Sequence, residues 1–301
     1  MNHHLGEFAA LLTTVFWTIT ALSFETAGKR IGSLNLNLLR LTAASILLAV
    51  FSYFHRGLFL PVDASAHNWL WLILSGLIGF VIGDFLLFQS FILIGARVSM
   101  LLMTLAPLFA ALAGWIILGE SLTLKSLMGM LLTLAGISIV VFTRTPGDNH
   151  QRRNTKLVHP ARGIVLAIGA AAGQGIGLVL SKLGMGSYDP FAASQIRVLA
   201  GAAGFAVVFT VLRKWNGLPL VIKDRKAMKW LLVGSIFGPF LGVSFSLMAV
   251  QHTSAGIAQT IMSLVPVFII PPSLIINKEK LHTRELIGAI VAVASVSVFF
   301  L

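Results

Sequence analysis

The chain has 301 residues, of which 57% are hydrophobic and 11% charged, whereas soluble domains carry about 25% charged residues; an ordinary water-soluble fold is therefore excluded. The formal net charge of +12 does not require a nucleic-acid partner, because basic residues gather in the cytoplasmic loops of membrane proteins. Without cysteine, the chain has neither a disulfide framework nor a thiolate nucleophile.

Apolar runs that are long enough to cross a bilayer follow one another along the whole chain. A membrane-spanning helix needs about 20 apolar residues, and ten such runs are present. They cover 7–25, 34–54, 69–90, 97–118, 124–143, 163–183, 191–212, 230–250, 255–276 and 284–301. Polar, basic stretches interrupt them at 144–161 and 213–229. The sequence thus predicts an all-α integral membrane protein with ten transmembrane helices in a lipid bilayer.

The first five runs and the last five are copies of one another. A shift of 159 residues lays 103–142 over 262–301 without a gap and pairs Pro and Glu positions that scattered apolar matches would not produce. Since five is an odd number, the two copies must cross the bilayer in opposite directions. We therefore expect two inverted five-helix repeats, at 1–143 and 162–301, joined by a basic linker at 144–161. Inverted repeats form their site near the bilayer midplane and expose it alternately to either side.

Both copies also carry a family resemblance. A Pro-x-Phe segment is followed by Gly-Glu-Ser-Leu at 119–122 in the first copy and by Lys-Glu-Lys-Leu at 278–281 in the second. In these features, in its segment 17–29 and in its five-span copies, nearly the whole chain resembles the EamA family of the drug/metabolite transporter superfamily. The resemblance implies a secondary carrier that exports or exchanges small metabolites by alternating access. It also implies a cavity lined by spans one, three, four, six, eight and nine.

Asp84 is the only acidic residue in the interior of a predicted span. A charge at the bilayer centre costs about 2.5–3.5 kcal/mol on insertion scales, so such a residue tends to face a wet cavity. Phe80 and Phe88 lie four residues to either side and share its helical face, which favours binding of a cationic or amine-bearing group or of a coupling proton. The alternative is a structural acid that is paired with an arginine or capped by hydroxyl groups. Its repeat partner is Val243.

Two arginines, Arg40 and Arg197, are paired by a shift of 157 residues, and each lies about seven residues inside a predicted span. A guanidinium can reach the interface from that depth, so both could simply be solvated. Alternatively, both could attract a carboxylate or phosphate group of a substrate. We therefore expect a small-molecule substrate that bears an amine or a carboxylate. Trp17 and Gln174 are further candidates for the cavity wall, although Trp17 could instead face lipid.

Small residues and prolines mark helix contacts and bends. Glycines spaced four residues apart allow two helices to approach closely; they are Gly79, Gly83, Gly169, Gly173, Gly177, Gly238 and Gly242. Proline removes a helical hydrogen bond and bends the helix, so the prolines predict either hinges for alternating access or static curvature around a cavity. They are Pro107, Pro266, Pro271 and Pro272.

Charged residues near the ends of the predicted spans have simpler interpretations. Glu120 and Glu279 precede new helices, where a carboxylate stabilises the helix N-terminus. Lys29 and Lys182 lie at span ends, which favours contact with water or lipid headgroups over a functional role.

Two other classes of protein compete with a transporter. An intramembrane enzyme would need a nucleophile with a base, or metal ligands; there is no HExxH motif, and the histidines lie in tails, loops or span ends. No GxxxxGK[ST] loop for nucleotide is present either. We therefore expect no enzymatic activity, no metal and no cofactor. A membrane scaffold that does not transport is the other alternative, but it leaves the interior acid and the inverted repeat without a purpose.

Two criteria predict opposite orientations of the chain in the membrane. With both termini cytoplasmic, as the family resemblance implies, three Lys and Arg residues fall inside and seventeen outside. The positive-inside rule favours the opposite arrangement, with both termini outside, and this is our prediction. We expect a multi-pass protein of the cell membrane, specifically a bacterial inner membrane. The sequence does not distinguish a monomer from a homodimer.

Overall fold

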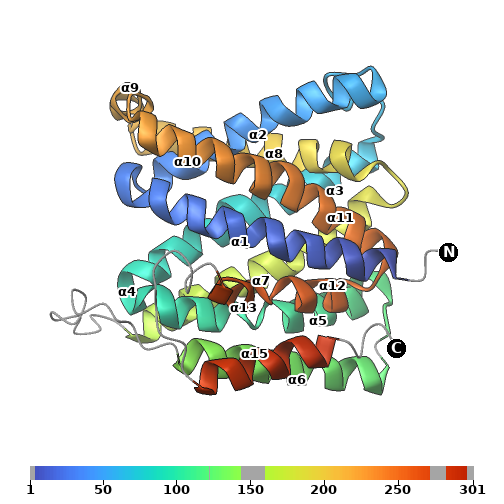
Figure 1. The fold of residues 1–301 in the computed structure, drawn as a ribbon. Coiled ribbons are helices and arrows are strands. Elements are labelled where there is room, and N and C mark those ends of the chain that lie inside the picture. Colours follow the sequence, from blue (N-terminus) through green and yellow to red (C-terminus); the bar gives the residue numbers. More distant parts are fainter. Residues whose placement is uncertain (1–3, 122, 144–159, 272–282, 297–301) are drawn as a thin grey trace, which may run out of the picture.

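The computed structural model describes residues 4–121, 123–143, 160–271 and 283–296, and these ranges contain helices and short connections but no strand (Figure 1). Six apolar helices are long enough to cross a membrane: Leu5–Gly28, Ser33–Arg56, Ala66–Leu87, Ala161–Met185, Pro190–Val211 and Arg225–His252. Four shorter apolar helices fall within the remaining predicted spans: Ala106–Leu118, Leu124–Ile139, Ala255–Phe268 and Leu286–Ser295. The all-helical membrane fold is confirmed for the described residues, whereas the number of ten crossings stays a prediction.

The helices fall into two halves along the chain, but the predicted connection between the third and fourth spans, at 91–96, is wrong, because α4 runs through it and the helix is interrupted only at 104–105. The first half contains α1 (Leu5–Ile31), α2 (Ser33–Arg56), α3 (Ala66–Gly76), η1 (Leu77–Gly83), α4 (Asp84–Met103), α5 (Ala106–Leu118) and α6 (Leu124–Thr143). The second half contains α7 (Pro160–Met185), α8 (Pro190–Val211), η2 (Trp215–Gly217), α9 (Leu218–Ile222), α10 (Arg225–Ser235), η3 (Ile236–Gly242), α11 (Val243–His252), α12 (Ala255–Met262), α13 (Val265–Phe268) and α15 (Thr283–Val296).

Local sequence signals set several helix ends. Gly32 ends α1 with a φ of 76°, a conformation that glycine adopts without steric cost. The side chain of Ser65 accepts a hydrogen bond from the Asn68 amide in a capping box at the start of α3. Asp189 caps α8 in the same manner, and Pro190 follows at the first helical position, where its missing N–H leaves no bond unmade.

Two π-helical turns, η1 and η3, occupy corresponding positions of the two copies, since Leu77–Gly83 and Ile236–Gly242 are 159 residues apart. A π-helical turn widens the helix and is frequent at functional sites. Periodicity did not predict either turn, because both sequences read as ordinary apolar helix.

The two copies interlock. Helix α1 of the first copy packs against α10, α11 and α12 of the second, and α7 of the second copy packs against α3, α4 and α5 of the first. Helices α6 and α15 pack together along one edge of the bundle (Figure 1). Each repeat therefore completes the other, and the interface between them runs through the centre of the molecule.

Close contact between α7 and the third span depends on glycine. A Cβ atom on Gly173 would lie 3.3 Å from the Cα of Gly83, and one on Gly177 would lie 3.2 Å from the Cα of Gly79. Gly169 lies beside Leu86, at 3.2 Å by the same measure. In the second copy the corresponding turn approaches α1, where Gly238 faces Thr20 and Gly242 faces Trp17.

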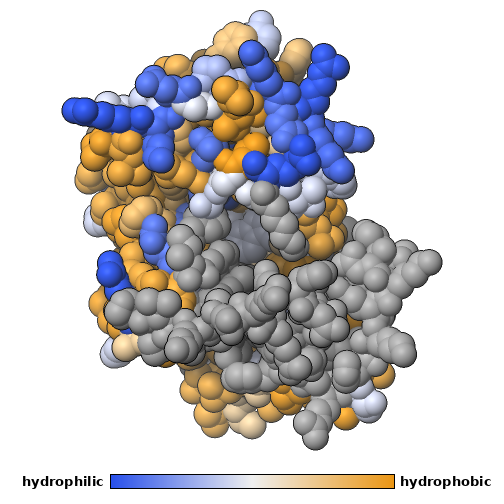
Figure 2. Space-filling model, turned by 90° about the vertical axis from the view of Figure 1, so that its left-hand side faces the viewer, coloured by the Kyte–Doolittle hydropathy of each residue, from blue (hydrophilic) through white to orange (hydrophobic). Residues whose placement is uncertain are grey.

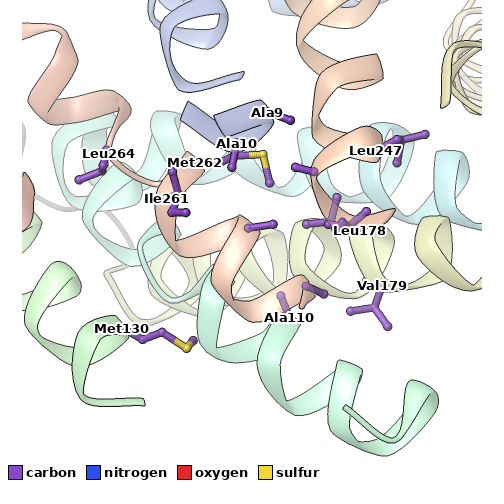
Figure 3. Close-up of a cluster of buried hydrophobic side chains, with 14 of the residues drawn as sticks. Ala9, Ala10, Ala110, Met130, Leu178, Val179, Leu247, Ile261, Met262 and Leu264 are labelled. Carbon is purple, nitrogen blue, oxygen red and sulfur yellow. The ribbon is translucent and has the colours of Figure 1, made fainter. Parts of the chain in front are cut away.

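The largest buried core lies where α1, α5, α7, α11 and α12 meet. Figure 3 shows small and branched side chains from these helices turned toward one another, among them Ala9, Ala10, Ala110, Leu178 and Ile261. The N-terminal half of α1 contributes to this core, so this part of the repeat interface is filled by apolar side chains.

The repeated prolines begin helices and do not bend them. Pro107 lies in the first turn of α5 and Pro266 in the first turn of α13, each after a turn that interrupts the helix, at 104–105 or 263–264. The first turn tolerates proline because its N–H groups have no intrahelical partner. Pro271 follows α13, and Pro272 lies outside the described residues.

Candidate functional site

A cavity of about 290 Å³ lies between the two copies. Its wall from the first copy contains Trp17, Thr20, Ala21, Arg40, Phe80, Asp84, Met103 and Thr104. Its wall from the second copy contains Gln174, Gly238, Pro239, Val243, Gln259, Met262, Ser263, Val265 and Pro266. The cavity therefore depends on residues of both repeats.

The cavity lies toward the end of the bundle where α1 meets α2. Trp17 lies at the middle of α1 and Thr20 and Ala21 lie in its C-terminal half, and Arg40 belongs to the N-terminal half of α2. Figure 2 views this end, where hydrophilic residues gather around α9 and the start of α10 and the surface is hollowed at its centre. The opposite half of the interface is the apolar core of Figure 3.

Asp84 is buried, with 8% of its surface exposed, and it forms an ion pair with Arg40 of α2. The Nε2 atom of Gln174, from α7, donates to Asp84 Oδ1 at 3.0 Å and to the Gly79 carbonyl oxygen at 3.2 Å. The acid is thus held by one group from each copy. The sequence left two alternatives for Asp84, a pairing with an arginine and a position in a cavity. In the structure Asp84 has both.

Arg40 has further partners that orient its guanidinium. Its Nε donates to Asn37 Oδ1 at 2.7 Å, and its Cζ lies 5.6 Å from the centre of the Phe24 ring. Sequence reasoning missed Asn37 and Phe24. The spacing of three residues between Asn37 and Arg40, which places them on one helical face, was the available signal.

Arg197, the repeat counterpart of Arg40, has a different environment. Only 5% of its surface is exposed, its Nε has no hydrogen-bond partner, and none of the ion pairs among the described residues includes it. Its Cζ lies 5.0 Å from the centre of the Phe80 ring. A cation–π contact contributes about 2 kcal/mol when desolvated, less than the several kcal/mol of burying an ion. Arg197 is therefore almost fully buried, and its charge is incompletely compensated by the described residues.

The aromatic candidates are only partly described. Trp17 and Phe80 line the cavity, and the indole Nε1 of Trp17 lies against Gly242, 2.6 Å from where a Cβ would be. The side chain of Phe88 lies outside the described residues, so the arrangement of two rings around Asp84 stays a prediction; Phe80 and Asp84 line the same cavity.

Sequence reasoning missed several residues of the wall that the repeat itself relates. Met103 and Met262 are counterparts at a shift of 159, as are Thr104 and Ser263, and all four line the cavity. Pro239, inside η3, also lines it. The repeat alignment contained this signal, because a cavity on a pseudo-symmetry axis is lined by equivalent positions.

A polar network joins the copies at the other end of the bundle, near the start of α1. Lys182 Nζ donates to Glu120 Oε1 at 2.5 Å and to the Thr253 carbonyl oxygen at 2.6 Å. Glu120 Oε2 accepts from the Ala255 amide at 3.0 Å, and Glu7 Oε1 accepts from Thr253 Oγ1 at 3.0 Å. The prediction that Lys182 is solvated is wrong, because the fold brings a distant acid to it. Likewise, Glu120 caps α12 and not the helix that follows it.

The solvated end near the cavity has an ion pair of its own. Arg30 Nε donates to Asp224 Oδ2 at 2.8 Å, and Asp224 also accepts from the Ala227 amide at the start of α10. The Ala227 amide and then the Arg30 guanidinium hold the pKa of Asp224 below its usual value. Glu279 lies outside the described residues, and the side chain of Lys29 is not described.

Comparisons with known proteins agree with this architecture. The sequence profile of the EamA-like transporter family matches the chain twice, over residues 4–142 and 161–301. A search of curated proteins finds no match. A solved structure described only as "Crystal structure of protein" has a TM-score of 0.75 and 17% identity, and the alignment covers 99% of this chain and 97% of that one; identity this low shows a shared fold alone. The chain belongs to the EamA-like transporter family, a family of membrane transporters within the drug/metabolite transporter superfamily.

Proposed function

We propose that the chain is a secondary transporter that exports or exchanges a small polar metabolite by alternating access around the cavity between its repeats. The observation that carries the proposal is the buried Asp84–Arg40 pair in a cavity whose wall comes from both copies. A buried charge in a membrane protein tends to mark a substrate or ion pathway, and this one is also bonded to Gln174 of the opposite copy.

The chemistry of the pair suggests how a substrate would be held. An amine on the substrate can replace Arg40 as the partner of Asp84, and the released guanidinium can then bind a carboxylate. A proton on Asp84 would break the same ion pair without substrate, which would couple transport to a proton gradient. Both routes use Asp84 as the group whose partner changes.

The surroundings of the pair suit a small amphipathic molecule. Trp17 and Phe80 offer aromatic surface, whereas Thr20 and Gln259 offer hydrogen-bonding groups from opposite copies. The helix breaks before Pro107 and Pro266, together with the π-helical turns η1 and η3, are the proposed points of movement.

The end of the interface near the start of α1, called here the closed end, must open during such a cycle. The network of Lys182, Glu120 and Thr253 crosses between the copies there, so relative motion of the copies would have to break it. We infer that the described state exposes the cavity toward the end with α9.

The experiment that tests the function begins with a screen of metabolites by thermal shift on purified protein, because a ligand that binds the native state raises its stability. The metabolite found is then followed in proteoliposomes containing wild-type protein, Asp84→Asn or Asp189→Asn. Asp189 caps α8, and asparagine caps helices equally well, so it controls for the substitution itself.

We expect Asp84→Asn to lower the transport rate by at least about tenfold, equivalent to about 1.4 kcal/mol in the barrier, while Asp189→Asn retains the wild-type rate. If the Asp84→Asn variant transports at the wild-type rate across the whole pH range, Asp84 has no role in the mechanism. A protein without ligand and without flux, but with a specific protein partner, would favour the scaffold alternative.

A further inference from the structure

Arg197 is a buried cation that has no role in the transport cycle proposed above. It is 5% exposed, and its Nε lacks a hydrogen-bond partner. Its backbone is fixed against α3, because a Cβ on Gly76 would lie 2.5 Å from the Arg197 carbonyl oxygen. Its Nη2 lies in the space that the missing side chain of Gly79 leaves, 3.5 Å from an ideal Cβ.

The repeat explains why no acid among the described residues pairs with this arginine. In the first copy, Arg40 pairs with Asp84. The counterpart of Asp84 in the second copy is Val243, which is buried and lines the cavity. Helices α8 and α11, which carry Arg197 and Val243, pack together. The place where a carboxylate would meet Arg197, by analogy with the first copy, is therefore the cavity wall at Val243.

The charges around the cavity are also unbalanced. Asp84 and Arg40 form an ion pair, whereas Arg197 contacts the cavity-lining ring of Phe80 and pairs with no acid among the described residues. A guanidinium has five N–H donors and no acceptor, and its preferred partner is a carboxylate or a phosphate. The phenyl ring is a weaker partner and can be exchanged for such an anion if it moves aside.

We propose that Arg197 is a concealed anion-binding subsite of the transport cavity, and that the substrate supplies the carboxylate or phosphate that Val243 lacks. The proposal rests on the proposed function, since it names the chemical class of the substrate. It requires Phe80 to move from the guanidinium when substrate binds, which changes the partner of Arg197 from a ring to an oxyanion.

The first experiment measures thermal unfolding of wild-type protein, Arg197→Met and Arg40→Met in phosphatidylcholine nanodiscs without ligand. An unpaired buried charge destabilises the fold, so Arg197→Met should unfold at the wild-type temperature or above it. Arg40→Met should unfold lower, because it leaves Asp84 unpaired. If Arg197→Met unfolds as low as Arg40→Met, Arg197 has a structural role and the proposal is wrong.

The second experiment supplies the missing acid within the chain. Val243→Asp is compared with the uncharged Val243→Asn, in the wild-type background and in Arg197→Met. With Arg197 present, Val243→Asp should be at least as stable as Val243→Asn, and with Arg197→Met the order should reverse. Leu247→Asp, one turn further along the same helix and fully buried, controls for a buried acid without a cation. An unchanged order in the two backgrounds would contradict the proposed contact.

The third experiment uses soluble probes of matched shape, namely benzoate, phenyl phosphate and neutral benzamide. Loss of a hydrogen bond to a charged group corresponds to about tenfold or more in affinity, so the anions should raise the unfolding temperature of wild-type protein more than benzamide does. Arg197→Met and Val243→Asp should both abolish that preference. Equal responses to benzoate and benzamide, or no response to any probe, would overturn the subsite.

Lipid and substrate are distinguished by the bilayer used. If phosphatidylglycerol in the nanodiscs produces the Arg197-dependent shift and the soluble anions do not, Arg197 binds a lipid headgroup and the inference about the substrate is wrong. Failure of this subsite is also separable from failure of the transport function. Flux that depends on Asp84 but responds to neither Arg197 nor anions would contradict the subsite alone.

Discussion

At the scale of single residues, the cavity contrasts two arginines that occupy equivalent sequence positions. Arg40 has Asp84, Asn37 and the Phe24 ring around its guanidinium, whereas in the described part of the chain the partner of the Arg197 guanidinium is the Phe80 ring. Burial of an ion costs several kcal/mol unless a partner compensates it. The energetic role of each arginine is therefore set by its neighbours and not by its place in the repeat.

This contrast predicts non-additive stability for the Asp84–Arg40 pair. Either Arg40→Met or Asp84→Asn alone removes one member, and loss of one partner of a buried pair costs about 3–5 kcal/mol when it strands the other charge. Because Asp84→Asn also removes the charge that Arg40→Met strands, the double variant should be more stable than Arg40→Met. A double-mutant cycle from thermal unfolding measures the coupling; additive losses would mean that the pair is solvated and independent.

At the scale of elements, the fold depends on close backbone contacts between helices of different copies. Glycines of α7 touch glycines of the third span, and Gly136 of α6 meets the Ala292 backbone of α15. Within a bilayer, helices associate through van der Waals packing and interhelical hydrogen bonds, and small residues allow both because they let the backbones approach closely. They also fix where Asp84 and Gln174 can meet.

Gly76→Ala tests this packing at the base of Arg197. The added Cβ would lie 2.5 Å from the Arg197 carbonyl oxygen, so α3 and α8 must separate, at a cost of about 1–3 kcal/mol. Gly28→Ala is the control, since its nearest contact would be Leu36 Cδ2 at an ordinary 3.5 Å. Thermal unfolding should show a clear loss for Gly76→Ala and none for Gly28→Ala. Equal midpoints would show that the α3–α8 contact yields without cost.

The network at the closed end also belongs to this scale, because it links a connection of the first copy to helix ends of the second. Lys182 lies on α7, and Glu120 lies in the α5–α6 connection. If this link holds the end closed, its removal should increase the time that the end spends open.

Since the chain contains no cysteine, a single introduced thiol can report that opening. Ala110→Cys places it in the fully buried core of the closed half. A water-soluble maleimide should modify it several times faster in the Lys182→Met background than in wild type. The matched control is Arg30→Met, which removes an ion pair at the opposite end. Identical rates in all three backgrounds would contradict a role of the network in closure.

At the scale of the whole molecule, the distribution of charge defines two different ends. Arg30, α9 and the start of α10 lie at one end, and the start of α1 lies at the other (Figure 1). Among the described residues, Arg30 and the basic segment 213–229 thus lie at the same end of the molecule, as the span order predicts.

The positive-inside rule predicts that this basic end faces the cytoplasm and that both termini face outward. A reporter fused after Leu301 that is active only in the cytoplasm should therefore be inactive, and one that is active only outside should be active. The reverse pair of results would support the orientation implied by the family resemblance. With that reversed orientation, the cavity would be open to the outside and not to the cytoplasm.

Several features of the fold and the site were predictable because they are local or repeated in the sequence. The apolar runs have the length of a bilayer crossing, and the glycine stripe of α7 has helical spacing. Asp84 is conspicuous because a lone acid in an apolar run has an energetic cost. The repeat offset of 159 also related Met103 to Met262, although their position in the cavity wall could not be recognised from composition.

The sequence by itself determined the membrane class and the two copies and marked Asp84 as a candidate, since periodicity, length and isolated charge are properties of the chain alone. Only the tertiary structure decided which charges are paired. Lys182 meets Glu120 across 62 residues, and Asp84 meets Arg40 across 44, while Arg197 meets no acid among the described residues. The physical reason is that pairing depends on how separate helices pack. The first copy has Asp84 where the second has Val243, so Arg197 lacks the carboxylate that Arg40 has at the equivalent position.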